Sequence, residues 1–319
     1  MPDRAVRRTP QAVVRELISY PIKGCAGMPV TRSQVTPAGL AHDRSFMVVD
    51  PGGVFRSQRR DPRLALVRPV VDPHGTRLTL RAPGIAPLEM AVELDAARRD
   101  VLLFGTRYRG IDQGDAVAGW LSEVLGAPSR LVRVPPEHDR VTDGEHPGTS
   151  GYADSCAVHL LSRSTLDLLN ERLLDRDAAP VPMSRFRPNI VLDGWPDPHT
   201  EDRARRLVVG TVELVYAKLA DRCAVTTVEP RTGMRTGPEP LRTLAGYRRV
   251  DGRIAFGVKY AVPGPGVVEV GAEAVVGEWR PPPRTEPAER AERAEPAERA
   301  GPAEPAGPAA PALSGRTGG

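Results

Sequence analysis

The sequence of 319 residues predicts a β-rich α+β fold with a few helices. Strand-like runs recur about every ten residues between residues 11 and 112, and Pro or Gly turns separate them, which is typical of a small barrel or sandwich. The chain contains 34 prolines and 31 glycines but few aromatic residues, which favours compact strands with many turns. A chain of this length can bury a large core or divide into two domains.

The first third of the chain is expected to consist almost entirely of strands. Apolar and β-branched residues fill these runs, and turn residues bound them. The expected strands are residues 12–20, 30–35, 46–50, 54–57, 64–71, 76–81, 88–92, 101–104 and 108–111. The period then becomes helical over residues 115–125, where one face is apolar and Gly126 suits the left-handed position that ends a helix.

Strands and short helices alternate in the rest of the chain. One helix is expected to begin at Ser162, with Ser164 and Asp167 as a capping box, and another within residues 239–248. The expected strands are residues 129–134, 157–161, 188–192, a hairpin at 207–216, and 223–228, 253–262, 266–270 and 274–279. Residues 280–319 are mainly Pro, Ala, Glu and Arg and predict a disordered tail, because such a segment buries too little apolar surface.

Charge and cysteine content exclude several classes of protein. The net charge of +4 forms no Lys/Arg stripe between aromatic residues, which argues against nucleic acid and suits a small anionic ligand. Cys25, Cys156 and Cys223 form no CxxC pair, so these thiols build neither a zinc knuckle nor an iron–sulfur cluster, and they favour a reducing compartment. Without a signal-peptide core or about 18 uninterrupted apolar residues, we expect a cytoplasmic protein with no membrane span.

The run Asp221-Arg222-Cys223 is the strongest candidate for chemistry. A thiol beside a fixed positive charge suits the thiolate, which attacks electrophiles and binds soft metals. The alternative is a small buried hydrophobe, which an unpaired cysteine in a strand usually is. The local residues alone favour the second interpretation.

Other candidates can be read either as binding residues or as ordinary loops. Lys23 and Gly24 lie in a Gly-rich turn, where backbone can approach a ligand and a lysine can reach an anion. Residues 185–189 (Arg-Phe-Arg-Pro-Asn) form either a ligand clamp or an edge loop. The helix start at Ser162 suits an anion. His42 could be a general base, although a loop histidine is more often a surface residue.

A long polar stretch, residues 135–156, contains several potential metal ligands. Loops of this length in compact domains are often lids over sites. Its His, Asp and Glu residues match no metal-site spacing, so a solvated loop is favoured over a metal centre. These residues are His138, Asp139, Asp143, Glu145 and His146.

Taken in order, several stretches resemble the MOSC superfamily, in particular the amidoxime-reducing components and their bacterial relatives. The matching blocks are residues 20–25 (Tyr-Pro-Ile-Lys-Gly-Cys), 42–44 (His-Asp-Arg), 186–191 (Phe-Arg-Pro-Asn-Ile-Val) and 222–230 (Arg-Cys-Ala-Val-Thr-Thr-Val-Glu-Pro), continued by 231–233 and 239–248. The resemblance spans about residues 12–278, and the order of the blocks makes chance matches implausible.

The resemblance implies a fold and a cofactor site. An N-terminal β-barrel domain (11–127) would pack on a MOSC β-barrel domain (128–279), with the molybdenum cofactor (Mo-molybdopterin) between them and the tail (280–319) outside. Cys223 would be the catalytic thiolate and the metal ligand. The residues expected to bind the pterin and its phosphate are Lys23, Gly24, Arg44, Ser162, Arg187, Asn189, Asp221 and Arg222.

Two positions depart from the family pattern, which usually has Ser at both. Gly24 loses a hydroxyl donor, although its backbone N–H remains. Asp221 adds a negative charge beside an anionic cofactor and should weaken binding unless a base compensates for it.

The implied function is a molybdenum-cofactor oxidoreductase that removes oxygen from N-hydroxylated substrates at a Cys-ligated molybdenum. The chain has no flavin or nicotinamide motif, so a separate ferredoxin-, flavin- or cytochrome-type donor and its reductase would deliver electrons. The partners would be this donor and a small substrate, without nucleic acid or membrane. At the superfamily level, pyridoxal phosphate binding is a further expectation. The alternatives are a carrier of cofactor or persulfide sulfur without redox turnover, and a cofactor-free binding module.

Overall fold

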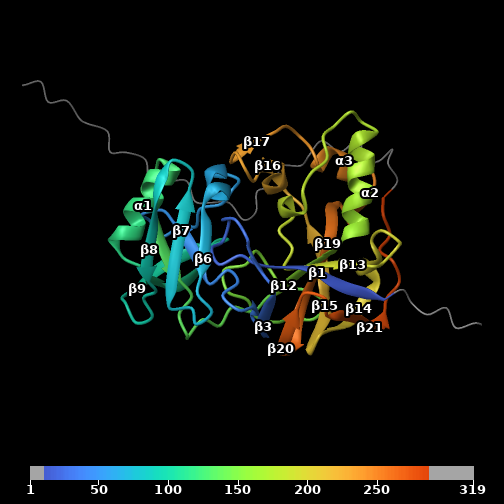
Figure 1. Cartoon of the computed structure of the whole chain (residues 1–319), viewed down its shortest axis with the longest axis horizontal. Helices are drawn as coiled ribbons and strands as arrows, with labels where there is room; N and C mark the ends of the chain where they lie inside the picture. Colours follow the sequence, from blue (N-terminus) through green and yellow to red (C-terminus); the bar gives the residue numbers. More distant parts are fainter. Residues whose placement is uncertain (1–10, 287–319) are drawn as a thin grey trace, which may run out of the picture.

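Seven strands close into a barrel in the right-hand part of the molecule (Figure 1). The computed structural model describes residues 11–286. Each strand in the sheet order pairs with the next, and the last, β19, pairs again with β12 through Val158 and Tyr260. In sheet order the strands are β12 (Val158–Ser162), β13 (Ile190–Asp193), β1 (Ala12–Ser19), β21 (Glu273–Trp279), β14 (Ala204–Val209), β15 (Val212–Asp221) and β19 (Arg253–Gly264).

Alternation along the barrel strands separates two apolar cores. Leu160 points into the barrel with Leu207 and Leu214, whereas the next residue, Leu161, packs on the outside with Leu169 of α2. This follows from the period of two along a strand. The elements on this outer face are the helices α2 (Arg163–Leu174) and α3 (Leu241–Ala245) and the 3₁₀ helix η2 (Met183–Arg185).

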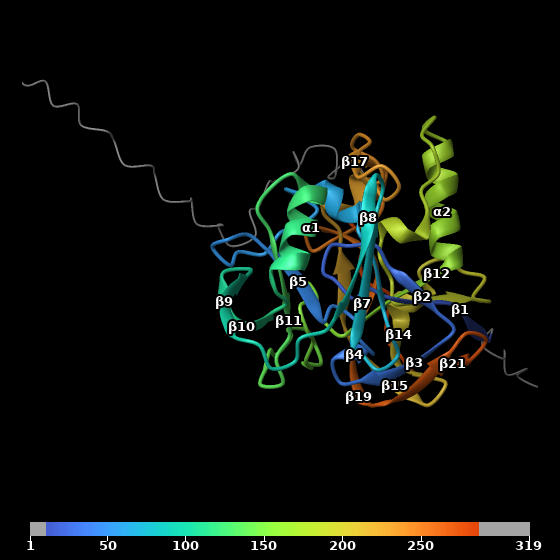
Figure 2. The ribbon, with the colours of Figure 1, turned by 60° about the vertical axis from the view of Figure 1, so that its left-hand side comes forward.

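Two antiparallel sheets and one helix form the other half, which Figure 2 turns toward the viewer. Helix α1 (Asp115–Leu125) packs on β11 and β8 and ends at Gly126 in the left-handed conformation. The first sheet contains β5 (Phe46–Val49), β11 (Arg130–Arg133), β10 (Thr106–Asp112) and β9 (Arg98–Leu103). The second contains β6 (Arg68–Val71), β7 (Arg77–Ala82) and β8 (Ile85–Ala91).

Short strands complete the fold. They are β2 (Met28–Val30), β3 (Arg32–Thr36), β4 (Gly39–Leu40), β16 (Val228–Glu229), β17 (Met234–Arg235), β18 (Arg249–Val250) and β20 (Gly266–Glu269). Strand β1 comes from the N-terminal segment but pairs with β13 and β21 of the barrel. The chain therefore crosses the boundary directly after β1, and the domain bounds at 127 and 279 stay a prediction.

The predicted β-rich α+β class is confirmed, but several local predictions are wrong. The expected strand 64–71 starts instead as the 3₁₀ helix η1 (Pro62–Leu66), which has proline in its first turn. The expected strand 30–35 is divided at Thr31 between β2 and β3. Residues 54–57 form isolated bridges at Val54 and Phe55 rather than a strand. Propensity could not place these breaks, because local turn geometry decides them.

The predicted capping box of α2 is also wrong. The residue that caps the helix is Ser162, whose hydroxyl oxygen accepts a hydrogen bond from the backbone N–H of Thr165 at 3.3 Å. Ser164 is already the second residue of the helix, two positions past the N-cap, so it cannot cap it.

Most of the predicted disordered tail, residues 287–319, lies outside the described residues. Its first residues, 280–286, contain no helix or strand but are attached to the barrel half. The backbone N–H of Arg280 donates to the carbonyl of Arg203 at 2.8 Å, and that of Glu286 donates to the carbonyl of Arg249 at 2.9 Å. Between residues 11 and 286, no helix is long and apolar enough to cross a bilayer.

Candidate functional site

Basic side chains from separate loops and one strand meet where the halves join. Lys23 follows β1, Arg44 precedes β5, Arg187 precedes β13, Arg222 follows β15, and Lys259 lies within β19. The positive charge of Arg44 repels the charges of Lys23, Arg187 and Lys259, and the charge of Arg222 repels that of Lys259. These side chains are therefore close enough to affect one another. We call these five residues the basic cluster.

Tyr20, next to the end of β1, organises two arginines of the basic cluster. The Cζ atoms of Arg44 and Arg187 each lie 4.3 Å from its ring centroid, within cation–π range. Both arginines have left-handed backbone, with φ of 45° and 57°. Such conformations are costly away from glycine and persist where the surrounding structure enforces them, often at functional sites.

A buried carboxylate fixes Arg44. Asp43 accepts two hydrogen bonds from Nη1 of Arg44, at 2.8 and 2.6 Å, and one from the backbone N–H of Tyr20 at 2.7 Å. Asn189 donates to Asp43 at 2.9 Å, and its carbonyl oxygen accepts the backbone N–H of His159 at 3.1 Å. Because Asn189 is only 1% exposed, it holds Asp43 and Arg44 in place rather than presenting its amide to a ligand.

Lys23 is buried among aromatic rings and faces one carboxylate. It is 5% exposed, its Nζ lies 4.7 Å from the ring centroid of Phe104, and it forms an ion pair with Asp154. Burial lowers the pKa of Lys23, and the Asp154 charge opposes this shift. Through Asp154, which the sequence did not suggest as a site residue, the long polar loop 135–156 contacts the basic cluster.

Gly24 occupies a backbone position that glycine suits. Its φ is +80°, a left-handed conformation, and a Cβ there would lie 3.3 Å from Cδ1 of Leu64. Its carbonyl accepts a hydrogen bond from Nε2 of Gln58 at 2.5 Å. The departure from the family pattern at this position therefore relieves backbone strain.

A neutral histidine orients Arg222. Nη2 of Arg222 lies 2.9 Å from Nε2 of His159. Because a guanidinium can only donate hydrogen bonds, Nε2 of His159 must be the acceptor. The imidazole proton is therefore on Nδ1, which lies 3.3 Å from the carbonyl oxygen of Arg187. Burial, reinforced by the Arg222 charge, holds the pKa of His159 well below its usual range. Burial also lowers the pKa of Arg222 to about 10.

Lys259 is the cluster member that sequence reasoning missed. It is the direct partner of His159 across the β12–β19 pair, so the two side chains project from the same face. Its Nζ has no hydrogen-bond or ion-pair partner between residues 11 and 286. Burial, with repulsion from Arg222 and Arg44, lowers the pKa of Lys259 to about 7. The available signal was a single charge within the otherwise apolar run 255–262.

Cys223 is the most accessible of the three thiols. Cys25 and Cys156 are buried, whereas Cys223 is half-buried. Burial raises the pKa of Cys25 to about 12. The sulfur of Cys223 has no hydrogen-bond partner in the described part of the chain, so it is free to bind a metal.

The predicted strand at 223–228 is wrong. Strand β15 ends at Asp221, and Cys223 caps the 3₁₀ helix η4 (Ala224–Thr227). The hydroxyl of Thr226 donates to the carbonyl of Cys223 at 3.0 Å, and that of Thr227 donates to the carbonyl of Ala224 at 2.8 Å. These bonds to carbonyls three residues back stabilise a turn that β-branched residues otherwise disfavour.

Three sequence candidates lie outside the basic cluster. Ser162, expected as an exposed anion ligand, is 1% exposed and donates to Glu201 at 2.8 Å. Asp221 points to Arg253, with Oδ2 and Nη1 2.8 Å apart, so its charge has a basic partner. His42 contacts the carbonyl of Pro73 at 3.2 Å.

The acidic residues of the polar loop have separate partners. Asp143 pairs with Lys218 at 2.7 Å and Glu145 with Arg205 at 2.6 Å. Within residues 11–286, no group of three His, Cys, Asp or Glu residues could hold a metal ion. A metal at Cys223 would therefore need ligands from a cofactor.

The charge balance of the basic cluster favours an anionic ligand. Its five basic groups face two carboxylates, Asp43 and Asp154, and each carboxylate already pairs with one cation. Buried cations without counter-ions are costly, and a bound anion would remove this cost. Arginine forks and lysine point charges are also the usual ligands of phosphate.

Comparison with known proteins gives two family matches. The family model described as the MOSC N-terminal beta barrel domain matches residues 11–128, and the model described as the MOSC domain matches residues 147–275. Mitochondrial amidoxime reducing component 2 of Rattus norvegicus is 34% identical over 275 residues, which cover 79% of each chain. Mitochondrial amidoxime-reducing component 1 of Homo sapiens is 33% identical over 279 residues, 81% of each chain. Molybdenum cofactor sulfurase of Danio rerio is 33% identical over 264 residues, 77% of this chain but 31% of that protein.

Proposed function

The chain belongs to the MOSC family, and from this premise we propose that it binds a molybdenum cofactor at the basic cluster and reduces N-hydroxylated substrates. The observation that carries the proposal is the half-buried, unpartnered thiol of Cys223, which follows an arginine of a cluster rich in uncompensated positive charge. The amidoxime-reducing names of its relatives support the reductive activity.

The donor set fits such a cofactor. Molybdenum favours soft sulfur ligands, and Cys223 provides one. The phosphate-bearing pterin requires cations, and Lys259 is a cation without a partner in the described structure. The left-handed backbone of Arg44 and Arg187 holds their guanidinium groups against Tyr20 before any ligand arrives.

Each residue of the site has a separate task in this proposal. Cys223 would ligate the metal, and the adjacent Arg222 places a positive charge beside its sulfur. Lys23, Arg44, Arg187 and Lys259 would neutralise the anionic cofactor, with the backbone N–H of Gly24 as a further donor. Arg222 itself is held by His159, so its charge has a fixed position beside the thiol.

When bound, the cofactor would supply the two-electron chemistry that removes oxygen from an N–OH group. Electrons would come from a separate ferredoxin-, flavin- or cytochrome-type donor with its reductase, because no flavin or nicotinamide motif occurs in the sequence. A cytoplasmic location and pyridoxal phosphate binding stay predictions.

A second candidate function is a carrier of the cofactor or of persulfide sulfur on Cys223. The similarity to molybdenum cofactor sulfurase, which this chain matches over 31% of that protein, favours it. An accessible thiol beside a fixed cation would serve either function.

Metal analysis tests the proposal. We expect wild-type protein, expressed with full cofactor supply, to contain molybdenum and pterin, and Cys223→Ala to lose the molybdenum. Benzamidoxime reduction with a chemical electron donor should proceed in wild type and stop in Cys223→Ala. If wild-type protein contained neither metal nor pterin, cofactor binding would be refuted. If it contained the cofactor but did not reduce benzamidoxime, the carrier function would be favoured. If Cys223→Ala reduced benzamidoxime at the wild-type rate, the assignment of Cys223 as the metal ligand would be refuted.

A further inference from the structure

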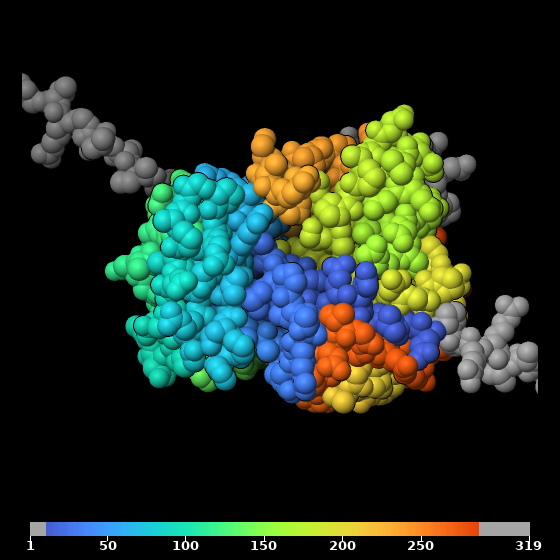
Figure 3. Space-filling model, viewed as in Figure 1, coloured from blue at the N-terminus to red at the C-terminus, as the bar shows by residue number. Residues whose placement is uncertain are grey.

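A cavity of about 270 Å³ lies beside the basic cluster, between the two halves. Figure 3 shows the hollow where the blue, cyan, orange and olive segments meet. Its walls come from β1, the turn after it, η1, residues 183–188 and residues 225–231. Arg187 and Tyr20 line it, whereas Lys23, Arg44, Arg222, Cys223 and Lys259 do not. The cavity therefore adjoins the proposed cofactor site and shares Arg187 with it.

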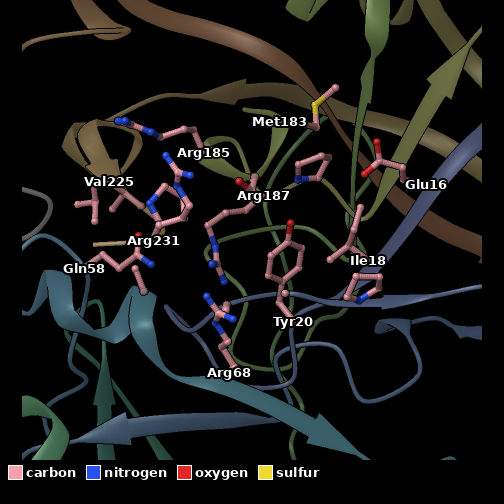
Figure 4. A pocket seen from close by; sticks show the side chains of 18 residues that line it. Glu16, Ile18, Tyr20, Gln58, Arg68, Met183, Arg185, Arg187, Val225 and Arg231 are labelled. Carbon is pink, nitrogen blue, oxygen red and sulfur yellow. The ribbon is translucent and has the colours of Figure 1, made fainter. Parts of the chain in front are cut away.

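The polar groups of this cavity are mainly unsatisfied donors. Figure 4 shows the hydroxyl of Tyr20 pointing into it, and this hydroxyl has no hydrogen-bond partner within residues 11–286. Burial raises the pKa of Tyr20 to about 12, so the group remains a neutral donor. Arg68 is exposed and also lacks a partner in that part of the chain. Nε of Arg185, a residue that is 7% exposed, is buried without an acceptor.

The charges along the cavity wall are mostly positive. The arginines are Arg68, Arg185, Arg187 and Arg231, and the lining carboxylate is Glu16. Figure 4 shows Glu16 on the opposite side from Arg68 and Arg231. Glu229, which does not line the cavity, forms ion pairs with Arg185 at 2.8 Å and with Arg231 at 3.6 Å. Positive charge therefore remains at the end that contains Arg68 and Arg187.

The remaining wall is apolar. Ile18, Met183, Pro188, Val225 and Val228 contribute to it. Small-molecule sites typically combine such a lining with a few convergent polar groups that fix the orientation of the ligand. A bare inorganic anion would leave this apolar surface unused.

From this combination we propose that the cavity binds a small organic acid, with a carboxylate directed at Arg68, Arg187 and the Tyr20 hydroxyl and a compact apolar body against Met183 and Val228. The binding requires no cofactor, and the titration below uses the cofactor-free protein because Arg187 also belongs to the proposed cofactor site. Removal of one charged donor from a carboxylate contact costs about 1.5–3 kcal/mol, which is about tenfold or more in affinity.

Calorimetric titration of the full chain with benzoate and its neutral isostere benzamide tests the inference. We expect wild type to bind benzoate about tenfold or more tightly than benzamide. Arg68→Gln should remove most of this preference. Because Arg68 is exposed on β6 and pairs with no carboxylate in the described structure, this change should leave the fold intact.

Arg107→Gln is the matched control, because Arg107 is an exposed arginine of β10 that does not line the cavity. It should leave benzoate affinity unchanged. Equal affinities for benzoate and benzamide, an absence of benzoate binding, or equal weakening by Arg68→Gln and Arg107→Gln would each overturn the inference. Displacement of benzoate by equimolar inorganic phosphate would overturn the role of the apolar wall.

Discussion

Nη2 of Arg222 lies 2.9 Å from Nε2 of His159, so a neutral imidazole holds the arginine that precedes Cys223. His159 is in turn the cross-strand partner of Lys259. These two relationships join the loop after β15 to the β12–β19 pair that closes the barrel. The proposed metal ligand therefore depends on the closure of the barrel for the position of its neighbouring charge.

The first prediction concerns acid stability. The folded-state pKa of His159 is below its unfolded value, so the unfolded chain binds more protons below about pH 6.5 and the free energy of unfolding falls as the pH falls. Burial lowers the pKa of His199 to about 3, which acts in the same direction. Each histidine should contribute up to about 1.4 kcal/mol per pH unit. Urea denaturation between pH 5 and 8 should show a smaller slope in His159→Gln than in wild type; equal slopes would contradict the prediction.

The second prediction concerns Lys259. Lys259→Met should raise the free energy of unfolding of the cofactor-free protein by about 1 kcal/mol or more at pH 6, because it removes a half-buried cation without a partner. The same variant should retain less molybdenum. Lys218→Met is the control, since Lys218 also pairs with β19 in the sheet but has Asp143 as its partner. Greater stabilisation in the control would argue against the prediction.

The third prediction is proton uptake on anion binding. The pKa of Lys259 is about 7 in the free protein, against an ordinary value of 10.5. A neighbouring anion should raise this pKa, so binding between pH 7.5 and 9 should take up protons. Titration with inorganic phosphate at pH 8.5 in two buffers of different ionisation enthalpy should give different observed enthalpies. The difference should disappear in Lys259→Met; its persistence there would assign the proton to another group.

The fourth prediction concerns Asp221, which was expected to weaken cofactor binding. Its charge is paired with Arg253, so Arg253→Gln should release the carboxylate and lower cofactor retention by about two- to fivefold, the range of an exposed ion pair. Asp221→Ser in the Arg253→Gln background should restore retention, measured as molybdenum per chain. Failure of this rescue would show that Arg253 acts by another route.

The fifth prediction concerns Gly24. Gly24→Ser and Gly24→Ala should both lower the free energy of unfolding by about 1 kcal/mol, because each places a Cβ on a backbone with φ of +80°. Thermal melts measure this loss. The two variants carry the same backbone strain, so a higher molybdenum content in the serine variant would isolate the hydroxyl contribution. A stabilised serine variant would disprove the strain.

The sequence by itself determined the β-rich class, because alternating apolar runs and Pro/Gly turns are local properties. It also determined helix α1 and its end at Gly126. The resemblance of ordered blocks indicated Lys23, Arg44, Arg187 and Arg222, and the structure brings these four basic residues together. Whether they hold a cofactor stays a prediction.

Only the tertiary structure decided which residues share a site and which do not. The pairing of β12 with β19 places Lys259 beside His159, although the sequence separates them by a hundred residues. Hydroxyl–carbonyl bonds convert a β-branched run into a 3₁₀ turn at Cys223. Burial beside Glu201 removes Ser162 from ligand contact. Strand pairing, burial and ion pairing depend on partners distant in sequence, and no local pattern encodes them.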